Sequence, residues 1–151
     1  YVRNPYARLV STYCDKVLPE RSTRGKVLDG VHHRFVTMGL PIYAGMPFEE
    51  FVEVVCGLDD ATTEKHLKSQ TWHLYRDGRH IVDEVGRVES IRDHWPRLAK
   101  RVGRPGELRR LNPSRHRHYA CYYPSATLRR RVADRYQMDF VNFGYCPDRF
   151  D

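Results

Sequence analysis

Residues 1–13 read YVRNPYARLVSTY, and this order predicts the end of a buried strand, a sharp turn and an amphipathic helix. Asn4 is a favourable helix N-cap, and Pro5 suits the first helical position because its missing N–H needs no intrahelical partner. The apolar side chains that follow recur at helical spacing and give the helix one face to bury: Tyr6, Leu9, Val10 and Tyr13. We expect this face to pack against a sheet.

The same stretch carries polar groups suited to a phosphate. Arg3 stands where the strand is expected to end, and Arg8 and Ser11 lie about one helical turn apart. A helix N-terminus offers free N–H groups and a partial positive charge, to which a guanidinium fork and a hydroxyl add further donors. A capped helix with solvated arginines is the alternative interpretation, because capped helices are common and carry no ligand by default.

The run Arg3-Asn4-Pro5-Tyr6-x-Arg8-Leu9-Val10-Ser11-x-Tyr13 resembles the 3′-phosphate-binding motif of the sulfotransferases. The likeness is strongest to the Golgi-type carbohydrate sulfotransferases and their bacterial relatives. In that family the arginine and the serine that follows it along the helix hold the 3′-phosphate of 3′-phosphoadenosine 5′-phosphosulfate (PAPS). The resemblance therefore implies this role for Arg3 and Ser11, and Arg8 also matches the pattern.

The resemblance continues along most of the chain. His66-x-x-x-Gln70 resembles the family's His-x-x-Pro-Gln pattern, although Lys68-Ser69 replaces the region around the proline. Met46–Val52 resembles the family's segment before a mid-chain helix, and Val82–Glu89 resembles its late strand ending in glycine, arginine and glutamate. Leu111–Tyr119 and Phe143–Tyr145 resemble its C-terminal loop and its ending.

The resemblance implies an α/β domain of the P-loop NTPase type, with a mostly parallel sheet flanked by helices and incomplete at its N-terminus. In the family, the loop that grips the 5′-phosphosulfate precedes the 3′-phosphate motif, whereas here only Tyr1 and Val2 precede Arg3, the first residue of the motif. We therefore expect residues 1–151 to be the C-terminal part of a single sulfotransferase domain. We also expect residues 1–151 alone to be inactive, because half of the charge-stabilising cradle would be missing.

Residues 59–75 hold the densest mixture of His, Lys, Gln and Trp in the chain. Sulfuryl transfer needs a base for the acceptor hydroxyl, and His66 is the candidate because imidazole titrates near neutral pH. A structural histidine that holds a loop is the alternative, and in the family the base often lies upstream. The arginine-rich stretch Gly103–Tyr119 is implied by the resemblance to fold over the nucleotide, with Ser114 and Arg115 contacting the 3′-phosphate.

Outside these motifs the chain predicts helices and one further strand. Three segments carry apolar side chains at helical spacing: Pro47–Leu58, Glu89–Val102 and Tyr122–Tyr136. His80–Val88 alternates polar and apolar residues as a strand does. Glu89 follows this strand, where it could cap the next helix or orient an active-site arginine.

The composition is that of a folded, basic domain. Charged residues make up 30% of the 151 residues and apolar residues 40%, which excludes disordered and membrane-spanning classes. The chain is long enough for one domain, or most of one, with a sizeable core. Its net charge of +7 implies an acidic partner, and charge alone allows a nucleotide, a sulfated or uronic polysaccharide, or nucleic acid.

Cysteine usage and hydropathy bear on metal binding and location. The four cysteines form no C-x-x-C pair, so no metal site is expected and free thiols are the commonest interpretation. There is no apolar run of about twenty residues and no signal-like start, while a membrane anchor upstream of Tyr1 stays open. We favour a cytoplasmic bacterial enzyme, with the Golgi membrane as the alternative.

These observations predict a PAPS-dependent sulfotransferase that acts on a hydroxyl of a carbohydrate-like acceptor, which the basic charge allows to be anionic. No metal is implied, because cationic side chains can neutralise the phosphosulfate. One alternative is a basic nucleic-acid-binding domain, disfavoured because the basic residues cluster at helix starts and in one loop and form no nucleic-acid motif. The other alternative is a kinase-like P-loop enzyme that uses ATP, although the chain shows no Walker-type lysine loop.

Overall fold

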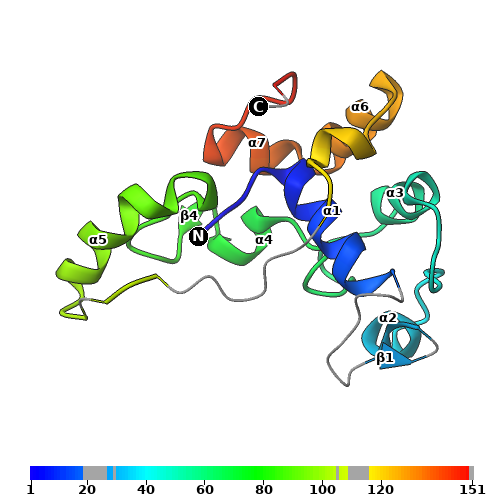
Figure 1. Cartoon of the computed structure of the whole chain (residues 1–151), viewed down its shortest axis with the longest axis horizontal. Coiled ribbons are helices and arrows are strands. Elements are labelled where there is room, and N and C mark those ends of the chain that lie inside the picture. Colours follow the sequence, from blue (N-terminus) through cyan, green and yellow to red (C-terminus); the bar gives the residue numbers. More distant parts are fainter. Residues whose placement is uncertain (19–26, 29, 105, 109–115, 150–151) are drawn as a thin grey trace.

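The computed structural model describes residues 1–18, 27–28, 30–104, 106–108 and 116–149. Within them the chain is mostly helical, and helix α1 (Pro5–Lys16) lies in the middle of the arrangement (Figure 1). The other helices, including the 3-10 helices η2 and η3, are α2 (His33–Thr37), α3 (Phe48–Cys56), α4 (Gln70–Leu74), η2 (Val88–Ser90), α5 (Ile91–Arg101), η3 (Tyr119–Tyr122), α6 (Ala126–Arg135) and α7 (Gln137–Phe143).

Helix α1 begins as its sequence predicts. The Asn4 side-chain oxygen accepts hydrogen bonds from the backbone N–H groups of Tyr6 at 3.0 Å and Ala7 at 3.4 Å. Pro5 occupies the first helical position, where its missing N–H costs nothing. The predicted apolar face is buried, and the Tyr13 hydroxyl donates to the Met46 carbonyl at 2.7 Å. The N-cap and the helix are therefore confirmed, but the face packs mainly against other helices.

The hydrophobic core surrounds α1 and joins segments that are distant in sequence. The rings of Tyr123 and Phe140 pack edge-on against the ring of Tyr6, with centroids 5.0 and 5.1 Å away. The buried residues that complete the core come from the segments after α1 and from α3, α6 and α7: Val31, Phe35, Ile42, Met46, Phe51, Val52, Val55, Leu67, Leu128, Val132 and Tyr136. Burial of this size is the main stabilising contribution to a domain of this length.

The strands are short and mostly antiparallel. The strands β1 (Val27–Leu28) and β2 (Val31–His32) form one two-stranded sheet, and β3 (Tyr75–Arg76) and β4 (Arg79–His80) form another. The turn between β3 and β4 has positive φ angles at Asp77 and Gly78, as a tight hairpin turn requires. The fold is thus a mixture of helices and small sheets within the described residues.

The predicted mostly parallel sheet is not found in the described part of the chain. Its one parallel pairing joins Val2 to Arg87: the Val2 N–H donates to the Gly86 carbonyl at 2.9 Å, and the Val88 N–H donates to the Val2 carbonyl at 2.8 Å. Pairing stops there because Asn4, the next residue whose backbone groups face that edge, donates its N–H to Glu89 Oε1 and gives its carbonyl to the Arg8 N–H of α1. The backbone groups of Arg3 face the opposite edge, where Gln70 binds them. A ladder needs successive backbone partners, and this one loses them after one residue.

The strand predicted over residues 80–88 is wrong except at its two ends. Residues 81–86 form bends and irregular backbone between β4 and the bridge at Arg87. Ile81 and Val82 are adjacent apolar residues, and both side chains are exposed. Alternation predicts a strand only if a sheet covers one face, and nothing covers this one among the described residues.

Three predicted helices are confirmed with shorter bounds, as α3, α5 and α6. Ser125 caps α6 by accepting a hydrogen bond from the Leu128 N–H at 3.1 Å. Helix α5 extends away from α1 (Figure 1) and buries only Ala99, whereas Val102 just beyond its end is 58% exposed. Its apolar spacing therefore predicted the helix correctly but not a buried face.

Candidate functional site

A surface pocket of about 310 Å³ lies where the extended segment before α1, α1 itself and the approach to α4 meet. It is lined by Arg3, Arg8, Ser11, Thr12, Lys65, His66 and His73. The pocket therefore brings together the candidate base and three of the five residues predicted to bind the nucleotide. Two guanidinium groups, one ammonium group and two imidazoles make its lining strongly favourable to an anion.

The backbone of Arg3 is held by hydrogen bonds, whereas its side chain makes none with the described residues. Its N–H donates to Gln70 Oε1 at 2.8 Å, and Gln70 Nε2 donates to its carbonyl at 2.8 Å. No hydrogen bond or ion pair joins the Arg3 guanidinium to another residue in the described ranges. Burial lowers the pKa of Arg3, although the nearby Glu89 carboxylate raises it. A partly buried arginine stays protonated at neutral pH, so this one is available to an anionic ligand.

Ser11 faces the same pocket, three residues after Arg8 on α1. Its hydroxyl has no hydrogen-bond partner among the residues that the structure describes. Thr12 also lines the pocket, but its hydroxyl donates back to the Arg8 carbonyl at 3.1 Å. Ser11 is therefore the better donor for a ligand.

Arg8 serves mainly to hold the neighbouring loop. Its Nη1 donates to the Lys68 carbonyl at 2.7 Å, and its Nη2 donates to the Lys65 carbonyl at 3.4 Å. These bonds tie α1 to the segment that carries His66. Arg8 contributes positive charge to the pocket, while part of its donor capacity goes to the fold.

His66 lines the pocket with its ring held from behind by Glu64. The Glu64 Oε2 atom accepts from the His66 N–H at 2.6 Å and lies 2.8 Å from His66 Nδ1. Burial raises the pKa of the Glu64 carboxyl, but the hydrogen bonds and charge of His66 outweigh it and lower this pKa to about 2. Glu64 is therefore ionised at neutral pH and His66 has one fixed orientation. Both predicted roles, base and loop-holding residue, are compatible with this geometry.

Helix α4 is held by a buried carboxylate that sequence reasoning missed. Asp139 on α7 is fully buried, and its two oxygens accept from the backbone N–H groups of Gln70 at 2.8 Å and Thr71 at 2.7 Å. Ser69, which replaces the family's proline, caps the same helix by accepting from the Trp72 N–H at 3.0 Å. The one sequence signal for Asp139 is that it is the only charged residue between Tyr136 and Cys146.

Glu89 holds the residue that precedes α1. Its Oε1 accepts from the Asn4 N–H at 2.7 Å, and its Oε2 accepts from the Tyr145 hydroxyl at 2.8 Å. Burial and this hydrogen bond raise the pKa of Tyr145. The Arg87 guanidinium lies 4.9 Å from the Tyr145 ring centroid, over its face. Glu89 thus fixes the backbone next to Arg3, and it makes no side-chain cap for the helix that follows it.

Two further predicted site residues, Ser114 and Arg115, lie outside the described residues. The structure therefore describes Arg3, Arg8, Ser11 and His66 of the predicted set. No group of three or more His, Cys, Asp or Glu side chains that could hold a metal ion occurs in the described ranges. Nor is any helix described by the structure long and apolar enough to cross a membrane.

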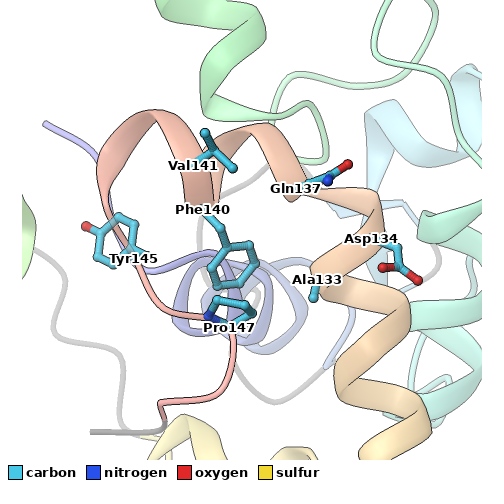
Figure 2. A pocket seen from close by; sticks show the side chains of 7 residues that line it. All are labelled: Ala133, Asp134, Gln137, Phe140, Val141, Tyr145 and Pro147. Carbon is cyan, nitrogen blue, oxygen red and sulfur yellow. The ribbon is translucent and has the colours of Figure 1, made fainter.

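A second pocket, of about 300 Å³, lies between α6, α7 and the chain that follows α7, and Figure 2 shows its lining. The lining residues are Ala133, Asp134, Gln137, Phe140, Val141, Tyr145 and Pro147. Asp134 is the one charged side chain of the described residues that line it, and its sign is negative at neutral pH. This pocket therefore does not suit a phosphate, whereas the pocket at α1 holds three of the predicted phosphate-binding residues and is the candidate site.

The site combines a capped helix start, an uncommitted arginine and an uncommitted hydroxyl, which defines a binding site for an anionic group. A model of the sulfotransferase family matches residues 1–146. The chain therefore belongs to the sulfotransferase family. Searches of curated proteins and of solved structures found no match to the chain.

Proposed function

We propose that this protein transfers a sulfuryl group from PAPS to a hydroxyl of a carbohydrate-like acceptor. Membership of the sulfotransferase family supports sulfuryl transfer in general. The observation that carries the choice of donor is the pocket in which the Arg3 guanidinium and the Ser11 hydroxyl, both uncommitted among the described residues, come together. Those two side chains have the spacing of the family's 3′-phosphate motif.

Arg3 binds the 3′-phosphate through charge-assisted hydrogen bonds, and Ser11 adds a hydroxyl donor. The residues of the pocket fit such a group, because a partly buried guanidinium with no hydrogen bond or ion pair among the described residues gains strongly from an anionic ligand. Lys65 and Arg8 add positive charge at the same place. Ser114 and Arg115 supply further contacts from the arginine-rich loop.

His66 accepts the proton of the acceptor hydroxyl. PAPS supplies an activated sulfuryl group whose bond to the 5′-phosphate is broken as the acceptor oxygen attacks. Removing the hydroxyl proton during attack lowers the barrier, and a fixed imidazole is suited to that step. What supports His66 is its position on the pocket and the hydrogen bonds that fix its orientation.

The wider setting of the site is proposed on the same basis. The parallel pairing of Val2 with Arg87 belongs to a P-loop-type sheet, and residues 1–151 are the C-terminal part of one sulfotransferase domain. The loop that binds the 5′-phosphosulfate lies upstream of Tyr1. The acceptor is anionic, which suits the net charge of +7. The enzyme is cytoplasmic, with the Golgi membrane as the alternative.

The test is transfer of radiolabelled sulfate from PAPS to a panel of neutral and acidic oligosaccharides by the full-length protein. We expect label in the acceptor and a loss of at least about 30-fold in kcat/KM for Arg3→Ala, as the loss of a desolvated charge pair implies. Arg130→Ala is the matched control, because that arginine side chain is 84% exposed on α6. Residues 1–151 alone are expected to transfer none, and absence of transfer by the full-length protein to every acceptor would refute the proposal.

A further inference from the structure

Glu64 is a buried acid that the proposed chemistry has not yet used. Its side chain is only 3% exposed, and no lysine or arginine of the described residues forms an ion pair with it. Its hydrogen bonds go to His66 alone, from the backbone N–H at 2.6 Å and with the ring Nδ1 at 2.8 Å, both at Oε2. Burying a carboxylate is costly unless it is fully compensated. The burial of a carboxylate whose hydrogen bonds all go to one histidine therefore needs an explanation.

The geometry fixes which ring nitrogen of His66 carries a proton. An ionised carboxylate only accepts hydrogen bonds, so Nδ1 must be the donor in the pair with Glu64. In the neutral ring the lone pair then resides on Nε2, because one nitrogen is protonated and the other is not. His66 lines the pocket, and Nε2 is the ring nitrogen that has no partner in the described part of the chain.

Two other basic side chains of this region, His32 and Lys68, form no hydrogen bond or ion pair with Glu64 in the described part of the chain. His32 packs edge-on against the His66 ring, with centroids 5.7 Å apart. Burial, helped by the charge of Lys16, lowers the pKa of His32 to about 4, so its ring is neutral at pH 7. The Lys68 ammonium is engaged elsewhere, by the Ala61 carbonyl at 3.4 Å. A positive charge that forms on His66 therefore has Glu64 as its immediate partner.

We propose that Glu64 is a positioning residue for sulfuryl transfer, which holds His66 with Nδ1 protonated and Nε2 free to accept the acceptor's proton. This inference rests on the proposed function. In the step, the acceptor O–H bond breaks, its oxygen forms a bond to sulfur, and the bond between sulfur and the 5′-phosphate oxygen breaks. The proton goes to Nε2, the electron pair leaves with adenosine 3′,5′-bisphosphate, and Glu64 stays ionised beside the imidazolium.

The first measurement needs no activity. Nitrogen-15 NMR of the His66 ring in the wild-type chain distinguishes the two neutral tautomers directly. We expect the signature of protonated Nδ1 at a pH where the ring is neutral, and its loss in Glu64→Leu. Glu50→Gln is the matched control for changes at Glu64, because Glu50 is exposed and accepts a hydrogen bond from Tyr43 at 2.8 Å. A wild-type ring with Nε2 protonated overturns the inference, whether or not any variant folds.

The second measurement is a kinetic double-mutant cycle in the full-length protein with Glu64→Gln and His66→Gln. If Glu64 acts through His66, Glu64→Gln lowers kcat by about 100-fold or more, as loss of an orienting carboxylate does, with little change in KM for PAPS. The same change then costs almost nothing once His66 is replaced. Glu64→Asp should recover part of kcat, because it keeps the charge.

The outcomes separate this inference from the function on which it rests. An equal loss from Glu64→Gln in both backgrounds makes Glu64 structural and overturns the inference while transfer by the wild type still stands. A raised KM for PAPS with unchanged kcat makes His66 a ligand of the nucleotide and also overturns it. If the wild type transfers no sulfate at all, the proposed function itself is contradicted.

Discussion

The side-chain amide of Gln70 pairs with both backbone groups of Arg3, by two hydrogen bonds of 2.8 Å each. It occupies the place that a strand would take on the edge opposite to the one where Val2 pairs with Arg87. The consequence is functional as well as structural. The backbone of the proposed phosphate-binding arginine is fixed before a ligand arrives, so little ordering entropy is lost on binding.

Gln70→Ala removes both of these bonds and leaves the backbone N–H and carbonyl of Arg3 without hydrogen-bond partners. We expect unfolding to become easier by about 1–3 kcal/mol, and adenosine 3′,5′-bisphosphate to bind about 10-fold more weakly because Arg3 is no longer held in place. Urea denaturation and calorimetry measure the two effects. Gln137→Ala, at an exposed position, is the control. Unchanged affinity with reduced stability would show that the clamp serves the fold alone.

Asp139 holds the start of α4 and, through Gln70, the backbone of Arg3. Asp139→Asn replaces one acceptor oxygen by an NH2 group, which would place N–H donors against the backbone N–H donors of Gln70 and Thr71. We expect a loss of about 2–4 kcal/mol in the free energy of unfolding, because buried N–H groups are left without acceptors. Thermal or urea denaturation measures it, with Asp134→Asn on the exposed surface of α6 as the control. Equal stability of the two variants would contradict the assigned role of Asp139.

Glu64 should make the protein sensitive to acid. Its carboxyl has a pKa of about 2 in the folded protein against an ordinary 4.5, so it stabilises the fold above about pH 5 and loses that contribution as pH falls toward 2. The contribution at neutral pH is about 3 kcal/mol at most. The stability difference between wild type and Glu64→Gln should therefore shrink steadily from pH 6 to pH 3. A difference that does not depend on pH would contradict the ionised, buried carboxylate.

Local patterns predicted the start of α1, while the site residues, named largely from the family resemblance, stay predictions. A cap, a proline and a helical spacing are all encoded within Asn4–Tyr13, so that part of the fold follows from neighbours in the sequence. The structure places Arg3, Arg8, Ser11 and His66 at one pocket, and their roles in binding and catalysis stay predictions. A family motif can indicate which residues lie together, because members of a family share contacts that residue spacing alone does not predict.

Several contacts that sequence reasoning missed span long distances in the chain, although the contact of Glu64 with His66 is local. Asp139 accepts a hydrogen bond from the Gln70 N–H, 69 positions away in the sequence, and Glu89 accepts hydrogen bonds from Asn4 and Tyr145. Hydrophobic periodicity does not predict a buried carboxylate such as that of Asp139, because its partners are backbone N–H groups, which every residue except proline has. The strand over residues 80–88 failed for the related reason that alternation specifies a face but not whether a neighbour covers it.

The salt dependence of binding separates the enzyme from the nucleic-acid-binding alternative. A nucleic-acid-binding domain releases one counter-ion for each phosphate that it neutralises, so its affinity falls steeply with salt. One bound nucleotide engages few phosphates, and we expect a shallow slope for adenosine 3′,5′-bisphosphate. Titrations at several salt concentrations with this nucleotide and with single-stranded RNA decide the question. Tight RNA binding with a steep slope, not displaced by the bisphosphate, would favour the alternative.

The most direct test of the account compares two ligands that differ by one phosphate. Calorimetry of the full-length protein should show adenosine 3′,5′-bisphosphate binding much more tightly than adenosine 5′-monophosphate. Arg3→Ala should cost about 2–4 kcal/mol for the bisphosphate and Ser11→Ala about 1–2 kcal/mol, while neither changes binding of the monophosphate. Arg130→Ala should leave both affinities unchanged, because its side chain lies on the surface of α6. Equal weakening of both ligands by both variants would contradict a 3′-phosphate site at Arg3 and Ser11.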